Sequence, residues 1–192
     1  MKTKVLLLAA LMMLPMMQLS AKKKPSYRNS DYKAGNFALQ NGKLYYEKVI
    51  TSAIPLTKLA ENLESKNAPQ AGIQVKSADK EAVRGVFIRK SFDWAGMGYK
   101  PKKIPWFARM PMNGNFEMVA MDKGYRVRVT DMWFTNQLKP SSNQHMKLED
   151  IVLKKGGMAL SKNKKTMRGL EILDKGISEI FAIQGSGLGS GF

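Results

Sequence analysis

Residues 116–134 limit the possible folds of this chain more than any other segment. Two strands, 116–121 and 125–134, are predicted on either side of Asp122-Lys123-Gly124, a turn typical of a β-hairpin. In the second strand the apolar residues at 125, 127 and 129 alternate with Arg126, Arg128 and Thr130. A half-buried antiparallel sheet has this alternation. We therefore expect one face of the sheet to be apolar and the other to be basic, with Arg126 and Arg128 on the basic face.

Further strands and two amphipathic helices surround this hairpin in the sequence. Aromatic and β-branched residues predict strands at 44–51, 73–77 and 83–90, and a short edge strand at 148–153. Apolar residues at three- and four-residue steps predict helices at 55–66 and 166–183, with Leu63 and Leu173 facing the core. This order, β-α-β-β-β-β-α, predicts an α+β fold. We expect an antiparallel sheet of about five or six strands with two helices on one face.

The first 21 residues have the layout of a secretory signal peptide. Lys2 and Lys4 precede an apolar run that ends near Ser20-Ala21, which offers small residues for cleavage. An uncleaved anchor is the alternative, but the run is short for a span of about 20 apolar residues and Pro15 interrupts it. We expect a periplasmic or secreted protein. It is not expected to be a lipoprotein, because the chain has no cysteine for a lipid anchor.

The predicted organisation after the signal peptide has three parts. Residues 22–42 are polar and lysine-rich, and they predict a flexible arm. Residues 43–184 are expected to form one α+β domain, and 185–192 a Gly/Ser tail. No second segment is apolar and long enough to predict a membrane span.

The chain is strongly basic, with a formal net charge of +17. A charge of this size favours anionic partners such as phosphate-bearing lipid, anionic polysaccharide, acidic protein or nucleic acid. A solvated lysine surface that keeps the domain soluble is the alternative. The lysines are spread along almost the whole sequence, which fits this second interpretation.

Few residues are suited to catalysis or metal binding. The chain has no cysteine and one histidine, His145, in a polar segment. Nucleophilic catalysis needs a base beside the nucleophile, and zinc sites need several His or Cys ligands. The sequence therefore predicts a non-enzymatic protein with no metal and no cofactor.

Residues 91–114 form a long connection in which aromatic and basic residues are interleaved. Such a segment can stack on bases or sugars and hold nearby phosphates. The candidate ligand-binding residues are Trp94, Tyr99, Lys100, Lys102, Lys103, Trp106, Phe107 and Arg109. The structural alternative is a lid whose aromatic rings fold back over the sheet.

The order of elements, the hairpin around Asp122-Lys123-Gly124 and the strand YRVRVTDMWF resemble a known family. The chain is similar to secreted bacterial domains of unknown function described as having a TBP-like fold. The resemblance covers about residues 44–183, and the 91–114 segment is an insert relative to it. It implies a curved antiparallel sheet with helices on one face. It supplies no catalytic residue and does not imply DNA binding.

These observations favour an exported binding or scaffolding domain of the cell envelope. Its expected partner is an anionic envelope component or an envelope protein. Binding of carbohydrate or lipid head groups through the insert is the alternative, and nucleic-acid binding by the basic sheet face is a third, less favoured by the compartment. The sequence does not predict an oligomeric state.

Overall fold

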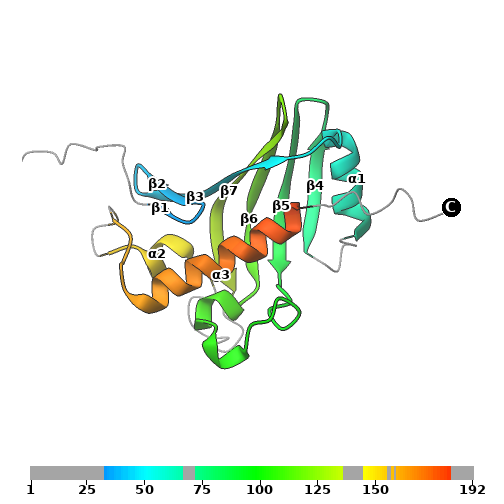
Figure 1. Cartoon of the computed structure of the whole chain (residues 1–192). Coiled ribbons are helices and arrows are strands. Elements are labelled where there is room, and N and C mark those ends of the chain that lie inside the picture. Colours follow the sequence, from blue (N-terminus) through cyan, green and yellow to red (C-terminus); the bar gives the residue numbers. More distant parts are fainter. Residues whose placement is uncertain (1–32, 67–71, 136–144, 155–156, 158, 183–192) are drawn as a thin grey trace, which may run out of the picture.

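The computed structural model describes residues 33–66, 72–135, 145–154, 157 and 159–182. An eight-stranded antiparallel sheet forms its centre, with strand order β1-β2-β3-β7-β6-β5-β4 and β8 paired with β7 (Figure 1). The strands are β1 Lys33–Ala34, β2 Phe37–Gln40, β3 Lys43–Thr51, β4 Ile73–Ala78, β5 Ala82–Lys90, β6 Met112–Met121, β7 Gly124–Thr135 and β8 His145–Lys147.

Helices cover one face of this sheet, as the sequence predicts. They are α1 Leu56–Lys66, the short α2 Leu148–Val152, and α3 Lys164–Phe181, which lies across the strands (Figure 1). One apolar cluster joins α1 and α3 to the inward side of the sheet. Leu63 and Leu173 are fully buried in it, as expected. The α+β fold class is therefore confirmed.

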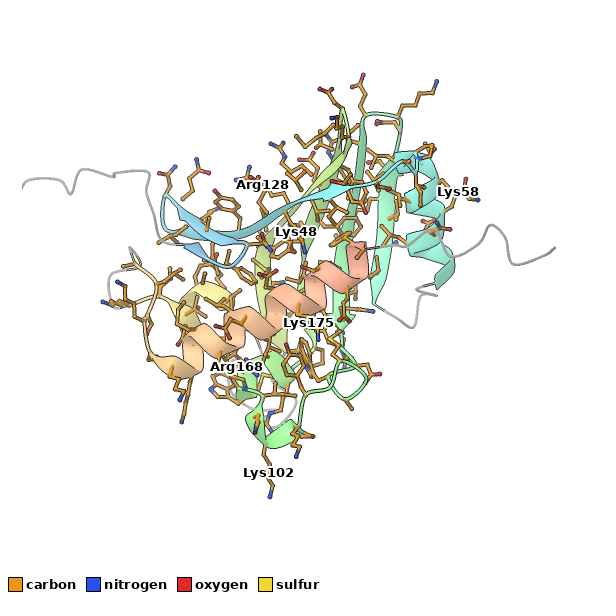
Figure 2. All side chains as sticks on the ribbon, viewed as in Figure 1. Lys48, Lys58, Lys102, Arg128, Arg168 and Lys175 are labelled. Carbon is orange, nitrogen blue, oxygen red and sulfur yellow. The ribbon has the colours of Figure 1, made fainter. Side chains whose placement is uncertain are left out.

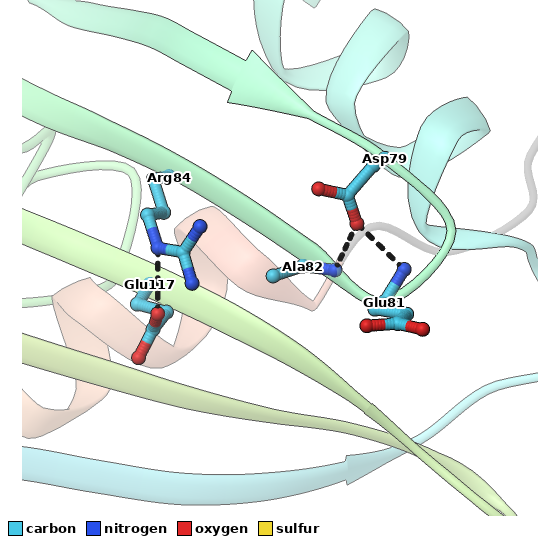
Figure 3. A network of polar contacts seen from close by, with 5 residues as sticks. All are labelled: Asp79, Glu81, Ala82, Arg84 and Glu117. Carbon is cyan, nitrogen blue, oxygen red and sulfur yellow. Dashed lines mark hydrogen bonds and ion pairs between the residues drawn. The ribbon is translucent and has the colours of Figure 1, made fainter.

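Tight turns fix the register of the hairpins. Asn41 and Gly42 connect β2 to β3 with φ angles of 52° and 75°, the positive values that a two-residue hairpin turn requires. At the β6–β7 turn Gly124 has a φ of 141°, and an added Cβ there would overlap the backbone of Ile50. Between β4 and β5 the Asp79 carboxylate accepts hydrogen bonds from the backbone N–H groups of Glu81 and Ala82 (Figure 3).

The strand pairing is irregular where β5 and β6 reach the insert. The pairing shifts between Phe87 and Lys90 and again between Asn113 and Asn115. Arg89 and Asp131 take φ angles of 51° and 50°, which non-glycine residues seldom adopt. The buried Asn113 side chain holds this region, since its Oδ1 accepts from the Arg89 N–H at 2.9 Å. Bulges of this kind redirect strands, and here they turn the chain toward the insert.

Three expectations about boundaries and secondary structure need correction. Residues 33–42 are not a flexible arm, because β1 and β2 pair there and Phe37 is fully buried against Tyr46. Residues 148–153 are not an edge strand, since Leu148 and Val152 bury one side of α2. The insert ends at about residue 111 because β6 begins at Met112. The predicted signal peptide, residues 22–32 and the 185–192 tail lie outside the described residues.

Candidate functional site

Two of the predicted ligand-binding aromatic residues, Trp94 and Phe107, are part of the hydrophobic core. Trp94 is 8% exposed and Phe107 is 3% exposed. The indole Nε1 of Trp94 donates to the backbone oxygen of Ala108 at 2.9 Å, and its ring stacks on Phe92 with centroids 4.7 Å apart. In this structure no ligand can reach either face of these rings. The lid interpretation placed the rings over the sheet, and Phe107 does contact Phe134 of β7, but the rings also pack against α3.

Helix α3 accommodates these rings at two glycines seven residues apart. An added Cβ at Gly169 would overlap the Phe107 ring, and one at Gly176 would lie 2.7 Å from Phe92 and 2.9 Å from Trp94. Glycine in a helix interior costs about 1 kcal/mol relative to alanine. The close approach of the insert to the α3 backbone explains why glycine is present at both positions.

Tyr99 is half-buried and contacts two cations of α3. The Arg168 guanidinium lies 5.5 Å from the centre of its ring and the Lys175 ammonium 5.1 Å. The Lys175 side chain also donates to the Met97 backbone oxygen at 3.1 Å. The insert therefore contacts α3 in two ways, through its buried rings and through the exposed contacts of Tyr99 and Met97.

The remaining predicted insert residues are exposed. Trp106 is 47% exposed, although its neighbour Phe107 points into the core. The exposed cations of the insert are Lys100, Lys102, Lys103 and Arg109. The eight predicted residues therefore do not form one stacking site, because Trp94 and Phe107 are separated from the exposed group.

The sheet face opposite α1 and α3 presents a row of alternating charges. Arg84 on β5, Glu117 on β6, Arg128 on β7 and Glu47 on β3 occupy successive cross-strand positions. Arg84 Nε donates to Glu117 Oε1 at 2.8 Å (Figure 3). Arg128 Nε is 3.9 Å from Glu47 Oε2, and Arg126 Nε is 4.0 Å from the same oxygen. We call the side chains of Arg84, Glu117, Arg128 and Glu47 the charge row. Both predicted basic-face arginines thus lie on this open face, although only Arg128 belongs to the row.

A hollow of about 300 Å³ is lined by three members of the charge row, Arg84, Glu117 and Arg128. Val86, Gly85 and Phe116 are its apolar lining residues. The ring of Phe116 is itself buried on the helix side of the sheet, against Phe87 and Phe181. Its polar and charged lining consists of Lys76, Arg84, Asn115, Glu117, Arg128 and Thr130. Three cations face one carboxylate here, so the hollow favours an anionic ligand.

Arg128 differs from Arg84 in its neighbours, because its guanidinium contacts residues of β2 and β3. Its guanidinium lies over the Tyr45 ring at 4.3 Å and donates a long hydrogen bond of 3.3 Å to Gln40. Its Nε is buried and has no hydrogen-bond partner among the described residues. A buried donor without an acceptor is costly. A carboxylate or phosphate in the hollow would meet the exposed part of the Arg128 side chain, which is 36% exposed.

The most strongly shifted pKa values belong to tyrosines that attach α3 to the sheet. Burial raises the pKa of Tyr125 to about 12, and the Tyr125 hydroxyl donates to the backbone oxygen of Phe181. Burial also raises the pKa of Tyr46, whose hydroxyl is 2.9 Å from Ser178 Oγ. Packing accounts for both shifts, so neither tyrosine indicates catalysis.

No group that could hold a metal was found among the described residues. Within that part of the chain, no three His, Cys, Asp or Glu side chains come together as possible ligands. His145 is exposed and lies edge-on to Trp133, with ring centroids 4.4 Å apart. The helices of the described segments are also too short or too polar to cross a membrane.

Sequence reasoning missed most residues of the hollow. Arg84 and Glu117 each belong to a strand that was predicted, and the alternation in both strands places them on the outward face. What the sequence does not contain is the register that sets Arg84 beside Glu117 and Glu117 beside Arg128. Lys76 lies within a register shift between Val75 and Ser77 that the pattern of residues does not show.

Comparison with known proteins identifies similar folds only. No protein-family model and no curated protein matches the sequence. A solved DUF4468 family protein from Bacteroides ovatus is similar over 81% of this chain and 95% of its own, with 11% identity and a TM-score of 0.45. A TBP-like protein from Parabacteroides distasonis is similar over 74% of this chain and 93% of its own, with 13% identity and a TM-score of 0.41. These descriptions agree with the resemblance stated from the sequence, and we draw no function from them.

Proposed function

We propose that this protein is an exported, non-enzymatic binding domain of the cell envelope, and that the hollow on its open sheet face binds an anionic ligand. The observation that carries the proposal is Arg128. Its side chain lines the hollow and is 36% exposed, and its ion pair with Glu47 is long, with 3.9 Å between Nε and Oε2. The high positive charge of the chain supports the same ligand class.

The spacing of the cations suggests the form of this ligand. Arg84 and Arg128 are on strands β5 and β7, with β6 between them. Neighbouring strands are about 4.8 Å apart, so the backbones that carry the two arginines are separated by roughly 10 Å across the sheet. Glu117 lies between them and would repel an anion at that point. An extended ligand with acidic groups at this spacing, such as an acidic protein segment or an anionic glycan, fits both features.

Affinity capture from envelope extracts tests this function. We expect the tagged mature protein to retain a component that Arg128→Gln no longer retains. Arg109→Gln removes an exposed arginine from the insert, away from the hollow, and is the matched control. Equal recovery with the wild-type and Arg128→Gln proteins would contradict the proposed site.

Export is a separate part of the proposal and has its own test. It rests on the basic start, the apolar run and Ser20-Ala21 in the sequence. We expect the mature protein to begin near Lys22. N-terminal sequencing decides this, and a membrane-bound product that keeps residues 1–21 would contradict it.

The non-enzymatic assignment rests on side-chain chemistry. The chain lacks cysteine, and its one histidine lies against Trp133. The hollow contains one carboxylate, Glu117, which is already paired with Arg84. Acid and base catalysis by carboxylates generally uses two such groups in one site.

A further inference from the structure

The outer side of the insert forms a second basic surface, distinct from the hollow. Its exposed residues from the insert are Lys100, Lys102, Lys103, Trp106 and Arg109. Arg168 and Lys175 of α3 continue it, because both lie beside Tyr99. Figure 2 shows Lys102 pointing away from the molecule at the tip of the insert, with Arg168 and Lys175 along α3. We call these seven residues the insert surface.

Trp106 is an unusual exposed residue. Of the large apolar side chains that are exposed in the described part of the chain, it is the only aromatic one. It follows Pro105 and begins the short helix η3, Trp106–Arg109, whose Phe107 and Ala108 are buried. The buried residues of η3 therefore fix the backbone that holds the exposed ring. The Trp106 ring lies edge-on to that of Phe107, with ring centroids 5.9 Å apart. An indole held in this way presents apolar area and one N–H donor to whatever the surface meets.

The charges around Trp106 are predominantly positive. Residues 91–111 contain four of the six cations of the insert surface and one acidic residue, Asp93. The Asp93 carboxylate already accepts a hydrogen bond from the Gly96 N–H at 2.9 Å. On α3, Glu171 is 3.4 Å from Arg168. Lys100, Lys102, Lys103 and Arg109 have no ion-pair partner among the described residues.

We propose that the insert surface docks on an anionic phospholipid leaflet, with Trp106 at the level of the head groups and the surrounding cations on the lipid phosphates. Tryptophan is enriched at membrane interfaces because its ring is amphipathic. Clusters of Lys and Arg are attracted to anionic lipid surfaces. A single-stranded nucleic acid would need several open rings for successive bases, whereas Trp94 and Phe107 are buried and cations cover Tyr99. One exposed indole among cations fits a leaflet better.

Vesicle flotation tests the proposal with the mature protein. The probes are vesicles of phosphatidylcholine alone and of phosphatidylcholine mixed equally with phosphatidylglycerol. We expect binding to the mixed vesicles only, with a blue shift of tryptophan emission and a steep loss of binding in salt. Trp106→Ala should weaken binding about tenfold and abolish the shift, and Lys102→Gln/Lys103→Gln should weaken binding about thirtyfold. Arg128→Gln should bind normally.

Other outcomes would overturn the proposal. Equal binding to both kinds of vesicle, or unchanged binding and emission with Trp106→Ala, would exclude this mode of docking. Soluble glycerol phosphate at the same phosphate concentration should leave the emission unchanged, and an equal shift would show an anion site instead of a leaflet site. Tight binding of heparin or single-stranded DNA without binding to mixed vesicles would identify a soluble polyanion as the partner. Circular dichroism of each variant keeps a folding defect from being mistaken for a binding defect.

Discussion

The ring of Phe107 packs against α3 at Gly169, in the space that a Cβ atom would occupy. The insert is consequently built into the core, and its buried rings depend on glycines in a helix that lies more than sixty residues further along the chain. The exposed part of the insert, around Trp106, is carried on this base. The hollow on the opposite face of the sheet contains none of the insert residues.

Alanine at Gly169 or Gly176 should destabilise the protein. Alanine normally favours a helix over glycine by about 1 kcal/mol, but here the added methyl group would collide with Phe107 or with Phe92 and Trp94. We expect each variant to lose about 1–3 kcal/mol of unfolding free energy in urea titrations. Glu179→Ala, at an exposed α3 position, is the control and should change the unfolding free energy by less than about 0.5 kcal/mol. Stabilisation by either glycine substitution would contradict the packing.

Trp94 and Trp106 should respond differently to the same substitution. Trp94→Ala removes a buried ring and leaves the Ala108 oxygen without its donor, so the free energy of unfolding should fall by about 3–5 kcal/mol. Trp106→Ala removes a half-exposed ring and should cost less than about 0.5 kcal/mol. Thermal and urea unfolding of the two variants measure this contrast. A comparable loss in both would show that Trp106 is a structural residue and would count against vesicle docking through it.

Leu63 and Leu173 connect the two main helices to one core. Both are fully buried in the same cluster, and replacement of either by alanine should cost about 2–5 kcal/mol. Each variant should still unfold in a single cooperative transition, because both residues belong to that cluster. Separate transitions in urea, seen by different spectroscopic probes, would contradict a common core.

Much of this core could be predicted from the sequence. The periodicity of residues 166–183 and the alternation in 125–134 locate α3 and β7 because each has one apolar side facing a large partner. Strands β1 and β2 escaped prediction because their short sequence is half polar and is stabilised by distant contacts. The Asp174 carboxylate of α3 accepts hydrogen bonds from the N–H and the side-chain amide of Asn36, at 3.1 and 2.7 Å. The Asn41-Gly42 pair was the available signal for a hairpin at this point.

The candidate sites were less predictable than the core. The aromatic residues of the insert are equally consistent with ligand binding and with core packing. The glycines of α3, against which the rings pack, distinguish the two roles. Arg128 was expected on a basic face. The position of its guanidinium, however, depends on contacts with Tyr45 on β3 and Gln40 on β2. Such cross-strand contacts follow from register, which local sequence patterns do not specify.

The alkaline stability of the protein should depend on Tyr125. Its pKa is raised from about 10 in the unfolded chain to about 12 in the folded protein. Folding therefore favours the protonated hydroxyl, and the contribution is fully present below pH 10 and is lost as the pH rises toward about 12. Tyr125→Phe should lower stability at neutral pH by about 0.5–1.5 kcal/mol, since the Phe181 oxygen loses its donor. It should also reduce the fall in stability between pH 10 and about 12. An identical alkaline profile in wild type and variant would contradict this assignment.

The hollow lined by Arg84, Glu117 and Arg128 is the central claim, and an amide-correlation NMR titration of the mature protein tests it most directly. The probes are a tetraglutamate peptide and inorganic pyrophosphate, which carry carboxylate and phosphate groups. We predict that at least one of them shifts the amides of Arg84, Glu117 and Arg128 and the Nε–H signal of Arg128. Arg128→Gln should abolish these shifts, and Arg109→Gln should preserve them. Shifts confined to the insert and α3, shifts that persist in Arg128→Gln, or no response of the charge row to either probe would contradict the account.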